Sequence, residues 1–128
     1  MTRYLLDTHT AIWFFNGDMR LSASARRIIC DQSNLMYLSI ASAWEVAIKL
    51  SLGKLGINGS TADFIQDAEG ASITLLPIKP AHLTALGTLP MLHRDPFDRL
   101  LMAAALAEGM TLITADENIE RYDVPQLW

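Results

Sequence analysis

Cysteine and long hydrophobic runs are both scarce in this sequence of 128 residues. The single cysteine, Cys30, has no partner for a disulfide within the chain, so the fold does not depend on an oxidising compartment. No cysteine–histidine spacing suggests a zinc site. The longest apolar run, residues 100–107, is far below the roughly 18 residues that span a bilayer, and Asp7 interrupts any signal peptide. These absences predict a cytoplasmic protein with no membrane partner.

Positive charge is also limited. Ten Lys and Arg stand against fourteen Asp and Glu, which gives a net charge of −4. Taken alone, this balance argues against non-specific nucleic-acid binding, because phosphate contacts need basic residues. If four of the acids bind metal, as argued below, the other ten balance the ten bases, and two divalent ions add +4. The acidity therefore does not exclude RNA, but it makes metal a condition for binding RNA well.

Apolar residues are abundant. They make up 51% of the chain and charged residues only 19%, so disorder is excluded and a substantial core can form. No internal repeat, low-complexity tract or linker divides the sequence. The length fits one domain, and we expect residues 1–128 to fold as a single unit.

Short β-rich segments alternate with longer helical ones. The patterns predict strands at residues 3–6, 35–38, 73–76 and 111–114, and helices at 8–16, 22–32, 39–52, 62–69, 81–86 and 99–108, with one more helical turn at 117–121. Such alternation is typical of a parallel sheet covered on both faces. The predicted fold is therefore α/β, a three-layer α/β/α sandwich with a central parallel sheet.

Four acidic residues occupy positions that this fold would bring together. Ligands of open α/β sheets bind beyond the carboxyl ends of the strands. Asp7 follows the first predicted strand, Asp116 follows the last, Asp98 stands at the head of a helix, and Glu45 lies in an otherwise apolar helix start, residues 40–48. Four carboxylates from distant positions could thus meet at one edge of the sheet.

Each acid also has a purely structural interpretation. Asp7 and Asp116 could cap the helices that follow them, and Asp98 could lie in the first turn behind an Asp95 cap. Glu45 could pair with Lys49 on a solvated helix face. Acids gathered at one edge, however, repel one another unless a cation holds them. Ligands that offer only oxygen suit Mg²⁺ or Mn²⁺.

Four segments, in order, resemble the successive motifs of PIN-domain proteins, and in particular the VapC-type toxins of toxin–antitoxin pairs. The segments are LLDTH (5–9), WEVAIK (44–49), HRDPFDRLL (93–101) and LITAD (112–116). The likeness runs from residue 3 to about residue 123. Each motif alone is weak, but the four in this order are highly specific.

The resemblance implies a PIN-like fold and a Mg²⁺- or Mn²⁺-dependent endoribonuclease that cuts structured RNA, such as tRNA or rRNA, or mRNA. It also implies a homodimer and inhibition by a cognate antitoxin. By motif position, the metal-binding acids correspond to Asp7, Glu45, Asp98 and Asp116, and Thr114 matches a hydroxyl near the metal. We interpret Asp95 as a helix cap. The alternative, a catalytically silent PIN-fold module that binds RNA or protein, is disfavoured because no acid is missing.

Several neighbouring side chains are candidate RNA contacts: Lys49, Arg94, Arg99 and His9. Ordinary salt bridges or packing are the competing interpretation for each of them, and also for His93. Residues 12–15 place one aliphatic and three aromatic side chains in succession, so either both faces of that helix are buried or one ring reaches a groove or an interface.

Two other classes of protein also place acids beyond a parallel sheet. A phospho-accepting response regulator needs a pair of acids after the first strand and a late lysine, but only Asp7 follows that strand and no lysine follows Lys79. A phosphatase with an Asp nucleophile would have a second Asp at position 9, where this chain has His9. Both classes are therefore disfavoured.

Overall fold

The structure, a computed structural model, describes residues 2–57 and 59–128. A five-stranded sheet in the order β3-β2-β1-β4-β5 forms its centre, and every neighbouring pair of strands is parallel. The strands are β1 (Arg3–Leu6), β2 (Leu35–Ser39), β3 (Thr74–Leu76), β4 (Thr111–Ile113) and β5 (Gln126–Leu127). The predicted central parallel sheet is confirmed.

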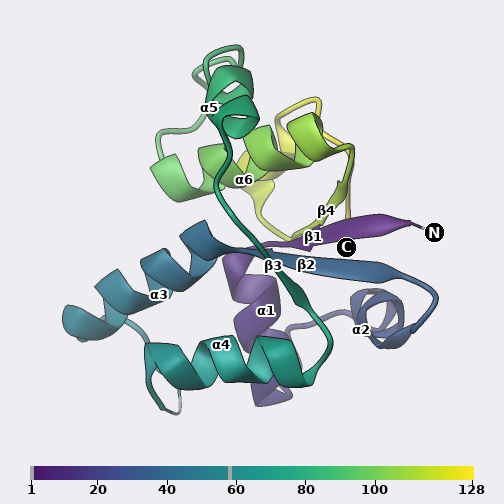
Figure 1. Ribbon diagram of the computed structural model, residues 1–128, viewed down its shortest axis with the longest axis vertical. Coiled ribbons are helices and arrows are strands. Elements are labelled where there is room, and N and C mark those ends of the chain that lie inside the picture. The colour runs from purple at the N-terminus through teal and green to yellow at the C-terminus, as the bar shows by residue number, and fades with distance from the viewer. Residues whose placement is uncertain (1, 58) are drawn as a thin grey trace.

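Helices cover the sheet on both faces. They are α1 (Thr8–Asn16), α2 (Ala23–Cys30), α3 (Ile40–Ser51), α4 (Thr61–Gly70), α5 (Pro80–Leu86), α6 (Pro96–Glu108) and α7 (Glu117–Glu120). Figure 1 shows α5 and α6 on one side of the sheet and α1, α2 and α4 on the other. The predicted three-layer α/β/α arrangement is therefore also confirmed. None of the described helices combines the length and the apolar character that a membrane span requires.

The central strand explains why the core forms on both faces. Leu5 and Leu6 of β1 are fully buried, and successive side chains of a strand point to opposite faces. Leu6 packs in the cluster beneath α1, α2 and α4, whereas Leu5 packs in the cluster beneath α6. Leu112 and Ile113 of β4 divide between the two clusters in the same way. A strand buried on both faces is continuously apolar, and this is the pattern that the sequence shows.

Most helix boundaries lie within one residue of the prediction, and two differ by more. α6 begins at Pro96 rather than Arg99, because Asp95 caps it and Pro96 occupies the first turn. α2 ends at Cys30, two residues early, and Ser22 caps its start. The strand β5 was not predicted. It has only two residues, too few for an alternating pattern, and it forms by pairing with β4.

Candidate active site

The sheet register brings the first and last predicted acids together. Leu6 of β1 pairs with Ile113 of β4, so Asp7 and Thr114 follow at the same level of neighbouring strands. The Thr114 hydroxyl donates a hydrogen bond to Asp7 Oδ2, and the backbone N–H of Asp116 donates to Thr114 Oγ1 at 3.1 Å. Thr114 is buried, so its hydroxyl fixes the direction of the Asp7 carboxylate.

Asp7 combines a capping role with an unusual electrostatic position. Its backbone is extended, and Oδ1 accepts the backbone N–H of His9 at 2.9 Å, which caps α1. The side chain is nevertheless buried, and this burial raises the pKa of the carboxyl above its usual value. The hydrogen bonds from Thr114 and His9 lower it only in part. Asp7 therefore caps α1 and is at the same time a carboxyl group buried away from water.

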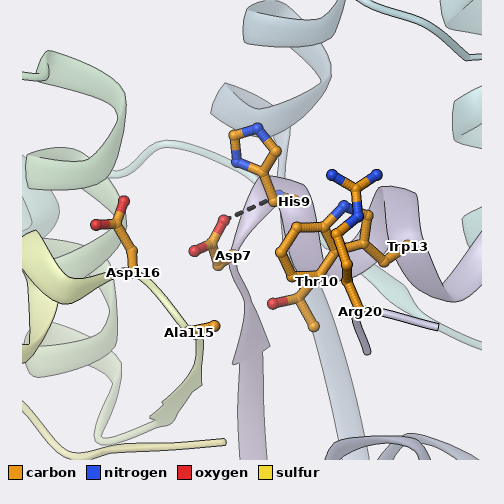
Figure 2. A pocket seen from close by; sticks show the side chains of 7 residues that line it. All are labelled: Asp7, His9, Thr10, Trp13, Arg20, Ala115 and Asp116. Carbon is orange, nitrogen blue, oxygen red and sulfur yellow. Dashed lines mark hydrogen bonds between the residues drawn. The ribbon is translucent and has the colours of Figure 1, made fainter. Parts of the chain in front are cut away.

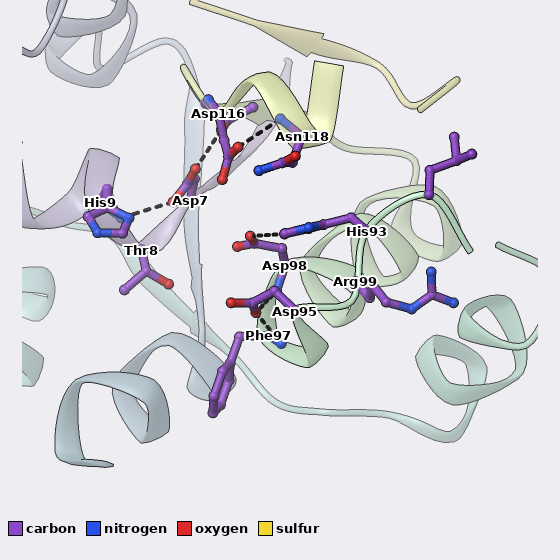
Figure 3. A network of polar contacts seen from close by, with 12 residues as sticks. Asp7, Thr8, His9, His93, Asp95, Phe97, Asp98, Arg99, Asp116 and Asn118 are labelled. Carbon is purple, nitrogen blue, oxygen red and sulfur yellow. Dashed lines mark hydrogen bonds and ion pairs between the residues drawn. The ribbon is translucent and has the colours of Figure 1, made fainter. Parts of the chain in front are cut away.

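The start of α6 places Asp98 opposite Asp7. Asp95 caps the helix as predicted, since its Oδ1 accepts the backbone N–H of Phe97 at 2.9 Å and of Asp98 at 3.0 Å. Asp98 then points towards the sheet edge, and His93 Nε2 lies 2.9 Å from its Oδ2 (Figure 3). Burial, followed by the charges of Asp95, Asp7 and Asp116, raises the pKa of Asp98 to about 7, against the opposing hydrogen bond from His93.

Asp116 completes a compact group of donor atoms. It caps α7 by accepting the backbone N–H of Asn118 at 2.8 Å, and it faces Asp98 across the edge (Figure 3). One ligand atom from each of His93, Asp98 and Asp116 lies within 4.8 Å of the others. Two of the predicted acids, 18 residues apart in sequence, therefore share one small region with His93. Asp7 is not part of this donor group, but its charge contributes to the raised pKa of Asp98.

Glu45 lies beside this group rather than within it. It is 3% exposed, and Oε1 accepts the hydroxyl of Thr8, the residue that follows Asp7, at 2.8 Å. Oε2 accepts from Lys49 Nζ at 2.7 Å, so the predicted i,i+4 pair exists. The pair does not lie on a solvated face, which corrects that part of the structural interpretation. Lys49 connects Glu45 to the other acids, because its pKa is raised first by Glu45 and then also by Asp95 and Asp98.

The donor set fits a hard divalent cation. Buried carboxylates whose pKa values are raised lack sufficient positive charge around them, and a cation placed among them would remove the repulsion. The oxygens of Asp7, Asp98 and Asp116 are the ligand type that Mg²⁺ and Mn²⁺ prefer. Electrostatics and ligand chemistry therefore agree on a candidate metal centre at the carboxyl edge of the sheet.

One candidate RNA contact is wrong. Arg99 is 9% exposed, and its Nη1 donates to the carbonyl of Pro90 at 2.9 Å and to Tyr122 Oη at 3.1 Å. Its side chain points away from the acids, as Figure 3 shows. Tyr122 Oη in turn accepts the backbone N–H of His93 at 2.9 Å. Arg99 and Tyr122 thus hold the loop that carries His93, and Arg99 is not available to a phosphate.

The other candidate contacts remain accessible. His9 and Arg94 are exposed, and Lys49 is partly exposed beside Glu45. Each is near the acids in sequence or in space, so each stays a candidate for contact with RNA.

A cavity of about 280 Å³ opens next to Asp7 and Asp116 (Figure 2). Its lining residues are Asp7, His9, Thr10, Trp13, Arg20, Ala115 and Asp116. Trp13 is thus the residue of the 12–15 run that lines this cavity. Phe15 instead packs edge-on against Phe64, with ring centroids 5.5 Å apart. Nothing in the sequence pattern had marked Arg20, which reaches the cavity from the loop after α1.

Comparisons with known proteins agree with this architecture. Residues 4–125 match the family model described as PIN domain. Ribonuclease VapC22 from Mycobacterium tuberculosis is 26% identical over 127 residues, which cover 98% of this chain and 96% of that protein.

Solved structures resemble the fold over nearly the whole chain. A VapBC2 structure from Rickettsia felis, bound to a DNA fragment from its promoter, has a TM-score of 0.74 at 15% identity and covers 98% of both chains. A DNA-bound VapBC from Salmonella typhimurium has a TM-score of 0.70 at 16% identity, covering 99% of this chain and 98% of that one. Fold, motif order and family match coincide, and the chain belongs to the PIN domain family.

Proposed function

We propose that the chain is a divalent-metal-dependent endoribonuclease and the toxin of a toxin–antitoxin pair. The observation that supports this most is the meeting of Asp7, Asp98 and Asp116 at one sheet edge, where burial raises the pKa values of the first two. Structural acids are normally paired with cations, whereas Asp7 and Asp98 also have neighbouring acids whose charges raise their pKa values further. The similarity to Ribonuclease VapC22 supports RNA as the substrate.

In this proposal Asp7, Asp98 and Asp116 hold Mg²⁺, or Mn²⁺. Glu45, expected from its motif as a fourth ligand, pairs with Lys49 beside them and stays a candidate ligand. When bound, a divalent cation supplies a Lewis acid for the phosphodiester and a water of lowered pKa. The protein groups hold the ligands in place. Thr114 fixes Asp7 by donating to its Oδ2, and Asp95 fixes the first turn of α6.

Two further side chains, His93 and Lys49, are partners of the acids. His93 holds the Oδ2 oxygen of Asp98, and Lys49 neutralises Glu45 at 2.7 Å. Without a cation the acids repel a phosphate, so substrate binding and metal binding are coupled. Lys49, His9 and Arg94 are then placed to contact RNA near the acids.

The proposed partners follow from the relatives. Structural neighbours include VapBC assemblies and a toxin–antitoxin complex from Klebsiella pneumoniae. We propose a cognate antitoxin that inhibits this chain, a homodimeric toxin, and action on cytoplasmic RNA. Cleavage measured with and without the purified antitoxin checks the inhibition, and the mass of the free toxin in solution checks the dimer.

Incubation of the purified protein with total RNA tests the enzymatic proposal. We expect new 5′ ends at defined positions in Mg²⁺ or Mn²⁺, none after chelation with EDTA, and none with the Asp116→Asn variant, which keeps the cap on α7 because Asn caps about as well as Asp. RNA that is bound but left intact by the wild-type protein in Mg²⁺ and in Mn²⁺ would instead support the silent binding module.

A further inference from the structure

The cavity beside the acids has two chemically different walls. Figure 2 shows Asp7 and Asp116 on one side and His9, Trp13 and Arg20 on the other. Asp98 and His93 do not line it, so it extends from the acid group towards α1. A ligand that filled this space would touch two of the proposed metal ligands and also a surface of flat rings.

The aromatic wall is braced on several sides. The indole of Trp13 meets Trp128 edge-on, with ring centroids 5.8 Å apart at an interplanar angle of 69°. The ring of His9 lies 6.0 Å from it, tilted by 47°. The Arg20 guanidinium lies over the indole, with Cζ 4.9 Å from the ring centroid. Planar groups and a cation therefore surround the open space.

Arg20 is held in this position by its neighbour Asp18. Nη2 lies 2.7 Å from Asp18 Oδ2, and Nε lies 3.1 Å from Oδ1. This forked contact keeps the pKa of Asp18 low, at about 2. Within residues 2–57 and 59–128 no hydrogen bond occupies Nη1 of Arg20, so that nitrogen is left to a ligand. The guanidinium needs little further ordering on binding, because Asp18 has already fixed it.

Nucleotides have the chemistry that these walls match. RNA-binding proteins stack unpaired bases on aromatic rings and on Arg guanidinium planes, and the adjoining phosphate needs positive charge. We propose that this cavity is a nucleobase subsite, which takes the base of a nucleotide next to the phosphate at the acids. This inference rests on the proposed function. It adds that the substrate is single-stranded RNA with an unstacked base.

A second indole shows what distinguishes Trp13. Trp44 on α3 is 58% exposed and packs against Phe97, with centroids 5.2 Å apart. Its surroundings are Ala47, Ile48, Ser51 and Leu52, which provide neither a cation nor an acid. Likewise, Arg26 lies over Phe14 at 5.9 Å without lining the cavity. Trp44 and Arg26 are therefore matched controls for Trp13 and Arg20.

Binding of 5′-AMP and of ribose 5-phosphate to the full chain in Mg²⁺, measured by calorimetry, tests the subsite. We expect AMP to bind about 5- to 100-fold more tightly than the sugar phosphate, the range that stacking of one base covers. Arg20→Met and Trp13→Leu should remove most of that difference, whereas Arg26→Met and Trp44→Leu should retain it. Arg20 is exposed, so its variant should fold even if Trp13→Leu loses stability.

Cleavage kinetics separate this inference from the nuclease proposal. Arg20→Met should raise KM for single-stranded RNA and leave kcat within about two-fold, because the residue binds the base and not the reacting phosphate. Equal affinity for AMP and ribose 5-phosphate in an enzyme that cuts RNA overturns the subsite alone. Discrimination between the two ligands by a chain that cuts no RNA overturns the nuclease proposal and leaves the subsite standing.

Discussion

Two charged clusters lie at opposite ends of the same strand and the same helix. At one end, Asp7 follows β1 and Asp98 lies in the first turn of α6. At the other end, Arg3 begins β1 and Glu108 ends α6. Glu108 contacts Arg3 at 3.6 Å, Lys79 at 3.3 Å and His82 at 3.1 Å.

The two clusters shift pKa values in opposite directions. The hydrogen bond from His82, followed by Lys79, lowers the pKa of Glu108 below its usual value. Burial and neighbouring acids raise the pKa of Asp98 to about 7. Glu108 has basic partners, whereas Asp7 and Asp98, which are proposed to bind metal, have neighbouring acids that raise their pKa values. The comparison distinguishes a cluster with balanced charges from an unbalanced one, and the unbalanced one is the proposed metal site.

The largest expected effect comes from removing a charge at the acidic edge. Asp98→Asn and Asp7→Asn should each reduce cleavage by on the order of 100-fold or more, the upper range for groups that support a metal. Neither change should lower Tm, since Asn can make the same cap at Asp7 and both carboxylates are destabilised by burial. RNA cleavage and thermal unfolding of the two variants check this. A lowered Tm with retained cleavage would place both acids in the structural class.

Without metal, the two clusters should make the stability of the fold depend on pH in opposite directions. The pKa of Asp98 is about 7 in the folded chain and about 3.8 ordinarily, so between these values the folded state binds more protons than the unfolded state. In EDTA, stability should therefore fall as pH rises from about 4 to about 7, by on the order of 1 kcal/mol or more. Mg²⁺ should oppose this loss. Glu108, with its lowered pKa, loses its contribution in the other direction, as pH falls below its ordinary value.

Thermal unfolding at pH 5 and pH 8, with EDTA and with Mg²⁺, measures the effect of pH. Asp98→Asn should flatten the profile recorded in EDTA. If the Tm of the wild-type protein without metal is higher at pH 8 than at pH 5, the acidic edge does not lack positive charge as proposed.

A smaller effect is expected at the balanced cluster. Glu108→Gln should cost about 1 kcal/mol, since it weakens charge-assisted hydrogen bonds whose partners Arg3 and Lys79 are partly exposed. Cleavage should stay within about two-fold of wild type. Denaturant unfolding measures the loss, and Glu69→Gln, at an exposed position of α4, is the matched control. A drop in cleavage without a drop in stability would assign Glu108 to the site.

The smallest effect is expected at Asp95, which lies three residues from Asp98. Asp95→Asn keeps the cap on Phe97 and Asp98 and removes one of the charges that raise the pKa of Asp98. Cleavage should change by no more than a few-fold, and Asp95→Ala should lose about 1 kcal/mol of stability through the missing cap. A loss of cleavage in Asp95→Asn as large as in Asp98→Asn would make Asp95 a metal ligand.

Much of the fold was predictable because its signals are local. Capping residues and apolar strands marked α1, α3 and β1, and alternation marked the parallel sheet. The short β5 was not predictable, because it depends on pairing with β4 rather than on its own residues.

The sequence indicated which residues form the candidate site better than it indicated how their side chains contact one another. The position after a strand identified Asp7 and Asp116, and the i,i+4 spacing indicated the pair of Glu45 and Lys49. No local pattern reveals that Glu45 also accepts a hydrogen bond from Thr8. Arg99 was misassigned because its direction is set by Pro90 and Tyr122, which are distant in sequence or outside its helix. The position of His93 depends on the contact of its loop with Tyr122, and that of Arg20 on Asp18 and Trp13.

The order of the strands has a consequence for how the protein is made. Asp7 is an early residue, while Thr114 and Asp116 emerge more than a hundred residues later and meet Asp7 only when β4 pairs with β1. A growing chain on the ribosome therefore carries no assembled acidic edge until β4 and Asp116 have been made. We expect a nascent chain shorter than this to leave the messenger that encodes it uncut.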